Sequence, residues 1–143
     1  MKPKEILVFG ATGNIGRNLI RKLTKNNYKV VAVTRNIHRK GFQLKTQANP
    51  GYLELVELER LDEVKIKDLF NSCSVCINLI GILYEKNKGQ FNKIHSVLPN
   101  ILSKIAKEKK IDQFIHVSAL GVENASNSVY AKSKLDGENN VKK

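Results

Sequence analysis

The chain has 143 residues, a length that fits one domain with a core of ordinary size. Its 41% hydrophobic and 27% charged residues are typical of a globular domain and exclude an intrinsically disordered chain. The formal net charge of +12 attracts polyanions in general. Because the lysines are scattered and are not interleaved with aromatic side chains, nucleic-acid binding is not expected.

The start of the chain lacks the pattern of a signal peptide. Residues 1–5 lead directly into the apolar run at residues 6–9, with no separate cationic segment and no cleavage site of small residues. No apolar run is long enough for a transmembrane segment. We therefore expect a cytoplasmic protein, either free or peripheral on the cytoplasmic face of a membrane.

Short apolar runs rich in β-branched residues alternate with longer stretches of helical period, which predicts βαβ units and a parallel sheet. Strands are expected near residues 4–9, 29–34, 53–57, 75–80 and 113–118. Helices are expected near residues 14–26, 62–71, 90–109 and 128–142. The prediction for residues 1–143 is a single α/β domain, a Rossmann-type doubly wound parallel sheet of about five strands with helices on both faces.

Two segments are less regular than this pattern. Residues 37–51 carry two glycines and a proline with little periodicity, so we expect a loop there. Pro99 lies within the helical run and cannot donate its backbone hydrogen bond. Because the apolar stripe continues on both sides of Pro99, we expect one helix with a kink.

A glycine-rich turn at residues 10–16 follows the first strand and opens an amphipathic helix. Gly10 would let the chain turn sharply, Gly13 would let the backbone approach a pyrophosphate, and Gly16 would let the helix pack closely. The N-terminus of the helix would present free N–H groups to the anion. The expected cofactor contacts in the turn are Gly10, Thr12, Gly13, Asn14, Ile15 and Gly16.

The end of the second strand predicts which nucleotide is bound. The sequence Val33-Thr34-Arg35-Asn36 has no acidic residue to bind a ribose 2′-hydroxyl. Arg35, helped by Arg39, is instead a candidate ligand of a 2′-phosphate, so NADP(H) is preferred to NAD(H). The alternative is that Arg35 is a solvated loop cation.

Ser118, Tyr130 and Lys134 are candidate catalytic residues. The spacing Y-x-x-x-K places Tyr130 and Lys134 one turn apart on one helix face, and Ser118 closes the preceding strand. The lysine charge would lower the tyrosine pKa, so that the phenol can exchange a proton with a substrate. In a lysine-rich chain the same spacing also arises by chance, with Tyr130 a half-buried helix residue.

The remaining candidates are read from the fourth strand and its surroundings. Asn78, Leu79 and Gly81 end that strand, so their backbone is expected to line the nucleotide cleft. His95 and His116 are expected to be packing residues. Cys73 and Cys76 form C-x-x-C, but one follows a helix and the other begins a strand, which favours buried structural thiols. No metal site is expected from two cysteines and three scattered histidines.

The segments VFGATGNIGRNLI, INLIGILYE, FIHVSALG and YAKSKLDGE resemble the atypical or extended short-chain dehydrogenases/reductases. Within that superfamily, which includes NAD-dependent epimerases/dehydratases, the chain more closely resembles the NAD(P)-binding accessory subunit family of respiratory complex I. The resemblance implies a nucleotide held by the three glycines and Arg35, structural rather than catalytic in the complex I subunit. It also implies protein partners in a membrane-associated respiratory complex.

The same resemblance leaves an enzyme open as an alternative. In sister proteins the residues matching Ser118, Tyr130 and Lys134 are catalytic, which implies an active NAD(P)-dependent reductase or a nucleotide-sugar epimerase/dehydratase. Members of both groups continue well past the position of Lys143. We therefore expect a chain truncated at its C-terminus, with an incomplete substrate site and an exposed sheet edge that favours association.

Overall fold

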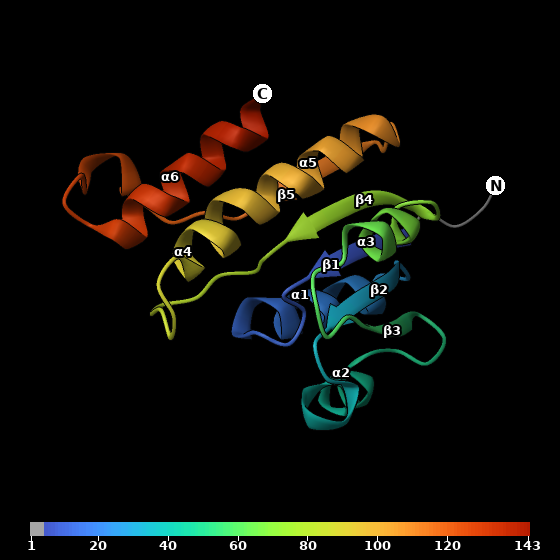
Figure 1. Cartoon of the computed structure of the whole chain (residues 1–143). Coiled ribbons are helices and arrows are strands. Elements are labelled where there is room, and N and C mark those ends of the chain that lie inside the picture. The colour runs from blue at the N-terminus through green and yellow to red at the C-terminus, as the bar shows by residue number, and fades with distance from the viewer. Residues whose placement is uncertain (1–4) are drawn as a thin grey trace.

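The computed structural model describes residues 5–143 and contains one parallel β-sheet (Figure 1). Its strands are β1 (Glu5–Phe9), β2 (Lys29–Thr34), β3 (Leu53–Glu57), β4 (Cys73–Asn78) and β5 (Gln113–His116). They lie in the order β3-β2-β1-β4-β5, and each neighbouring pair is parallel. This confirms the predicted Rossmann-type sheet, whose strand order reverses between β1 and β4. Residue 4, the expected start of the first strand, lies outside the described residues.

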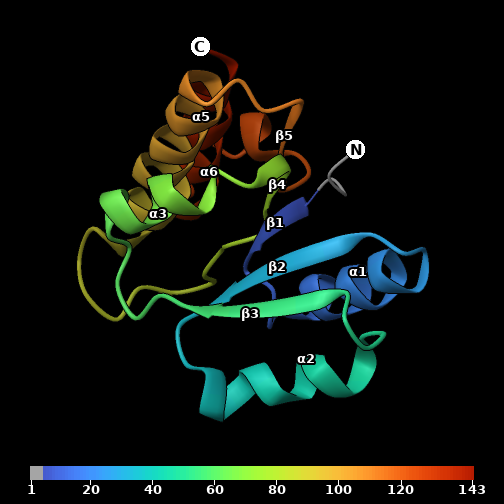
Figure 2. The same ribbon diagram turned by 90° about the vertical axis from the view of Figure 1, so that its right-hand side faces the viewer.

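Helices cover both faces of the sheet, as the sequence predicts (Figure 2). They are α1 (Asn14–Lys25), α2 (Phe42–Gln47), α3 (Glu63–Leu69), α4 (Gln90–Asn92), α5 (Leu98–Glu108) and α6 (Val129–Lys142). Two π-helical turns, at Ile37–Gly41 and Lys93–Val97, and a 3₁₀ turn at Val122–Asn124 complete the regular structure.

Each face of the sheet has its own hydrophobic core, because alternate residues of a strand point to opposite faces. The face covered by α3 and α5 buries Leu7, Phe9, Ile66, Phe70, Leu102 and Ile105. The face covered by α1 and α2 buries Ile6, Val8, Ile20, Val30, Ala32 and Leu44. The strands are thereby fixed in register, so that their carboxyl ends meet at one rim of the sheet.

The prediction of a loop at residues 37–51 is wrong, because residues 37–47 are helical. The side chain of Asn36 caps a π-helical turn by accepting a hydrogen bond from the backbone N–H of Arg39, at 3.0 Å. Leu44 of α2 is completely buried against the sheet. Tertiary burial of this leucine stabilises a helix that is too short to show a periodic apolar stripe.

The expected kink at Pro99 takes the form of a π-helical turn at Lys93–Val97, directly before α5. Pro99 cannot donate to the carbonyl of His95, the α-helical acceptor four residues earlier. That carbonyl oxygen faces α6, where an added Cβ at Gly137 would overlap it. The irregular turn therefore lies where α6 packs most closely against the preceding helix.

Candidate functional site

The turn at residues 10–16, called the phosphate turn below, connects β1 to α1. Gly10 has φ +76°, and an added Cβ there would lie 2.7 Å from the carbonyl carbon of Leu79. An added Cβ at Gly16 would lie 2.6 Å from the carbonyl oxygen of Ala11. Both distances are shorter than real side-chain contacts, so the folded chain itself requires glycine at these two positions.

Gly13 differs from the other two glycines of the phosphate turn. It is exposed, and the nearest atom to an added Cβ is the carbonyl oxygen of Gly10, at an ordinary 3.5 Å. It is the N-cap of α1, which has neither a side-chain cap nor an acidic residue in its first turn. The protein fold thus leaves room above Gly13 and leaves the positive end of the helix dipole uncompensated.

The other expected contacts of the turn lie around this opening. Thr12 is half-buried, whereas Asn14 and Ile15 are exposed. Ile15 is 60% exposed, which places an apolar side chain next to uncapped helix N–H groups. A ligand with an anionic part and a flat apolar part fits this combination.

The segment after β4, residues 79–82, is called the post-β4 loop and borders the phosphate turn. The backbone N–H of Leu79 donates to the carbonyl of Phe9 at 2.9 Å, and Gly10 packs against Leu79. Gly81 is exposed two residues further on. The structure therefore brings the phosphate turn and Leu79 together at the point where the strand order reverses, the usual ligand-binding position in such sheets, with Gly81 two residues further along the loop.

Arg35 and Arg39 lie exposed at the carboxyl end of β2, on the same rim of the sheet. The turn that carries them is held by Glu57 at the end of β3, whose carboxylate accepts from the backbone N–H of Ile37 at 3.1 Å. No sequence pattern indicates Glu57, because the acidic residue that signals nucleotide choice is expected at the end of the second strand and not of the third. The charge of Glu57 opposes that of the arginines at this corner of the site.

Lys134 is nearly completely buried at 5% exposure. Its Nζ donates to the carbonyl oxygen of Val117 at 3.4 Å, next to Ser118. Burial lowers the pKa of this ammonium, and the charge of Glu138 partly opposes that shift. An added Cβ at Gly81 would lie 3.6 Å from Nζ, so Lys134 also borders the post-β4 loop.

Ser118 and Tyr130 complete the candidate catalytic group. The Oγ of Ser118 is buried and has no hydrogen-bond partner within residues 5–143. Tyr130 is half-buried in the first turn of α6, with its ring edge-on to Phe91 at a centroid distance of 5.7 Å. A buried hydroxyl without a partner and a buried ammonium with one long hydrogen bond are typical of a polar site that a ligand completes.

His95 has a larger role than the expected packing residue. Its ring is buried, with Nε2 at 3.0 Å from the backbone N–H of Ile82 and Nδ1 at 2.9 Å from Oγ of Ser133. Burial, with a smaller contribution from Lys134, lowers the pKa of His95 to about 4, so the ring is neutral at physiological pH. Its place on the buried face of the helical run, four residues after Phe91, is a sequence signal of burial but not of the hydrogen bond to Ile82.

His116 also makes polar contacts rather than apolar packing alone. Its Nδ1 lies 3.2 Å from the side-chain amide nitrogen of Asn78, which is completely buried. The side-chain oxygen of Asn78 accepts from the backbone N–H of Ile80 at 3.2 Å. Burial lowers the pKa of His116. An added Cβ at Gly137 would overlap the backbone carbonyl of His95 and lie 3.7 Å from Nε2 of His116, so both histidines lie beside α6.

The two cysteines are free thiols in the sheet. Cys76 is completely buried, and Cys73 begins β4 rather than preceding it. Burial raises the pKa of Cys73 to about 11 and also raises that of Cys76. Such thiols carry little thiolate, which supports the structural interpretation. No group of ligands suited to a metal ion, and no helix long and apolar enough to cross a membrane, occurs in residues 5–143.

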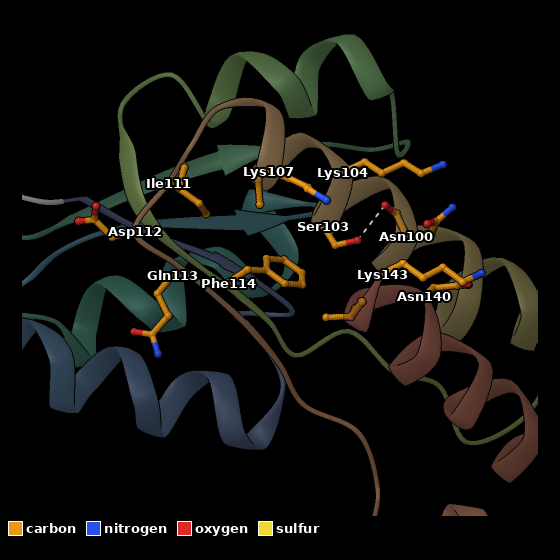
Figure 3. A pocket seen from close by; sticks show the side chains of 12 residues that line it. Asn100, Ser103, Lys104, Lys107, Ile111, Asp112, Gln113, Phe114, Asn140 and Lys143 are labelled. Carbon is orange, nitrogen blue, oxygen red and sulfur yellow. Dashed lines mark hydrogen bonds between the residues drawn. The ribbon is translucent and has the colours of Figure 1, made fainter.

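A cavity of about 530 Å³ lies beside the edge strand β5, between the C-terminal parts of α5 and α6 (Figure 3). Its lining includes Lys104, Lys107, Gln113, Phe114 and Asn140. Because Gln113 and Phe114 begin β5, the cavity opens at the amino ends of the strands. The phosphate turn follows the carboxyl end of β1, so this cavity is separate from the candidate site.

Comparison with known proteins finds one matching family model and several related sequences. The model of the NmrA-like family matches residues 2–143. NADH dehydrogenase (ubiquinone) 1 alpha subcomplex subunit 9, mitochondrial, from Mus musculus is 30% identical over 94% of this chain and 36% of that protein. The Arabidopsis thaliana protein of the same name is 33% identical over 94% of this chain and 34% of its own length. The chain thus spans about a third of these relatives.

Solved structures share the fold. A putative NAD-dependent epimerase/dehydratase from Bacillus halodurans superposes with a TM-score of 0.80 at 21% identity, covering 98% of this chain and 65% of that chain. The Bordetella bronchiseptica enzyme WbmG, solved in complex with NAD and UDP, gives a TM-score of 0.75 at 15% identity, covering 96% and 48%. Both likenesses support the Rossmann-type sheet described above.

Proposed function

Because the chain belongs to the NmrA-like family and has a phosphate turn after β1, we propose that it is an NAD(P)(H)-binding Rossmann module. One observation carries this proposal. The fold leaves room for a Cβ at Gly13, since a Cβ added there would make one ordinary contact, with the carbonyl oxygen of Gly10 at 3.5 Å. A bound pyrophosphate would occupy that space and accept hydrogen bonds from the uncapped start of α1.

Different residues at the rim of the sheet would contact different parts of the nucleotide. We propose that Gly10, Gly13 and Gly16 hold the pyrophosphate, with Thr12, Asn14 and Ile15 around it. Arg35 would contact a ribose 2′-phosphate and so favour NADP(H) over NAD(H), while Leu79 and Gly81 would line the other half of the cleft. The bound nicotinamide nucleotide supplies a hydride carrier, and this chain's residues bind and orient it.

The proposed partners follow from the relatives, whose names identify subunits of NADH dehydrogenase. We propose that the module docks on a membrane-associated respiratory complex and that its nucleotide stabilises the docking surface. Nothing in this role requires turnover, because binding free energy alone stabilises the folded state. Such a protein would be peripheral to the membrane, on its cytoplasmic face.

A second function, an NAD(P)-dependent oxidoreductase or epimerase, is favoured by the Ser118, Tyr130 and Lys134 region. The ammonium of Lys134 is buried with one long hydrogen bond, and Oγ of Ser118 has no partner within the described chain. In this reading Lys134 stabilises the phenolate of Tyr130, which exchanges a proton with a substrate oxygen that Ser118 orients. Both groups would then gain the hydrogen bonds that they lack.

Thermal unfolding with and without nucleotide tests the binding function. NADPH at about a hundred times its dissociation constant should raise the midpoint temperature by about 5 °C or more. Gly13→Val should abolish this rise, because its side chain fills the space of the pyrophosphate. Asn18→Val places the same side chain on the exposed face of α1 and should retain the rise. A wild-type midpoint unchanged by NADPH and NADH would exclude the proposal.

Removal of the Tyr130 hydroxyl tests the proposed oxidoreductase or epimerase function. If the whole protein oxidises NADPH with a carbonyl or quinone substrate, Tyr130→Phe should lower turnover by about 10²-fold or more and leave NADPH affinity unchanged. Tyr84→Phe removes a hydroxyl from an exposed ring and should have no effect. Turnover that survives Tyr130→Phe would rule out the assigned proton exchange.

A further inference from the structure

His95 connects the post-β4 loop to α6. Its Nε2 lies 3.0 Å from the backbone nitrogen of Ile82, and its Nδ1 lies 2.9 Å from Oγ of Ser133. The ring stacks on Phe91 at 5.5 Å and meets the ring of Tyr130 edge-on at 5.3 Å. It is 1% exposed, so water does not compete for these contacts.

The partners fix the direction of each hydrogen bond. The N–H of Ile82 can only donate, so Nε2 of His95 must accept and carries no proton. A neutral ring then carries its proton on Nδ1 and donates to Oγ of Ser133. That hydroxyl in turn donates to the carbonyl of Tyr130 at 2.7 Å. A directed chain of hydrogen bonds therefore runs from the loop through His95 into the first turn of α6.

The post-β4 loop is held by side chains on both sides of Gly81. The N–H of Ile80 donates to Asn78, and the N–H of Ile82 donates to His95. Gly81, between these two anchors, is exposed, and a Cβ added there would lie in ordinary contact with Nζ of Lys134 at 3.6 Å and Nε2 of His95 at 3.7 Å. Loss of either anchor would free the backbone that presents Gly81.

We propose that His95 is a positioning residue that holds the post-β4 loop in the shape that receives the nucleotide. This inference rests on the proposed nucleotide-binding function. His95 does not contact the open surface of the phosphate turn; it acts through the Ile82 hydrogen bond. Because the loop is ordered before binding, nucleotide binding does not have to supply the free energy of ordering it. The affinity for the nucleotide is therefore higher.

Two amide substitutions separate positioning from packing. The terminal oxygen of His95→Gln reaches the place of Nε2 and can accept from Ile82, whereas that of His95→Asn reaches only the place of Nδ1, toward Ser133. Both variants lose the ring contacts with Phe91 and Tyr130, so each controls for the other. We expect His95→Gln to bind NADPH within about threefold of wild type and His95→Asn to bind about tenfold more weakly.

Amide hydrogen exchange of Ile82, measured without nucleotide, tests the hydrogen bond to His95 separately from nucleotide binding. Protection should persist in His95→Gln and be lost in His95→Asn, with equal thermal midpoints for the two variants. Equal Ile82 exchange in both variants, or unequal exchange with equal NADPH affinity, would overturn the positioning role. If wild type binds no nucleotide, the proposed function fails and the positioning role with it, while the exchange pattern still reports on the hydrogen bond.

Discussion

Gly13 and Gly16 lie three residues apart, yet a side chain would have opposite consequences at the two positions. Gly16→Ala places a Cβ 2.6 Å from a backbone oxygen and should lower the free energy of unfolding by about 3 kcal/mol. Gly13→Ala should cost only about 1 kcal/mol, the usual loss for alanine at an N-cap. Urea denaturation of both variants measures the difference. Equal losses would show that Gly13 is needed for folding rather than for binding.

Arg35 is the residue on which the choice of nucleotide depends. Arg35→Ala should weaken NADPH binding by about tenfold or more, since it removes a charge-assisted hydrogen bond, and should leave NADH binding nearly unchanged. Arg21→Ala removes an exposed cation from α1 and serves as the control for net charge. Equal weakening of both nucleotides in Arg35→Ala would instead assign Arg35 a general electrostatic role.

The glycines of the phosphate turn could be placed from sequence because each has a separate steric reason. The sharp turn after β1 permits no side chain at Gly10, and the close packing at the start of α1 permits none at Gly16. The structure shows both restrictions. The roles of His95 and Glu57 could not be predicted in the same way. Each depends on a backbone N–H from a distant segment, which no local pattern reveals.

The contact between α6 and the turn at Lys93–Val97 holds in place the helix that carries Tyr130 and Lys134. Gly137→Ala would force its Cβ against the carbonyl oxygen of His95, so it should lower the free energy of unfolding by about 3 kcal/mol. Asn139→Ala changes an exposed position on the same helix and should cost less than about 0.5 kcal/mol. Chemical denaturation distinguishes the two, and a Gly137→Ala variant as stable as wild type would mean that the helices can separate without cost.

Long elements were predicted better than short ones. The strands and the longer helices have repeated apolar positions, and the sequence expectation agrees with the structure within a few residues. The short helix α2 depends on the burial of a single leucine, and the π-helical turn depends on Pro99 together with the approach of α6. Both features arise from tertiary contacts, which a window of sequence does not contain.

At the scale of the whole molecule, the parallel order could be predicted because alternating strands and helices permit few topologies. The sheet ends at β3 and β5, and the cavity beside β5 lies among residues that the motif analysis did not use. The phosphate turn and this cavity lie at opposite ends of the strands. Substitutions at the edge, such as Phe114→Ala, should therefore leave nucleotide affinity unchanged, as calorimetry can check.

The most direct test of nucleotide binding is calorimetric titration of the purified protein with NADPH and with NADH. We expect saturable binding of one nucleotide per chain, tighter for NADPH, because the uncapped start of α1 and Arg35 both favour phosphate groups. Absence of binding heat with either nucleotide across a range of temperatures would contradict the assignment. The phosphate turn would then be a structural connection between β1 and α1 and not a binding site.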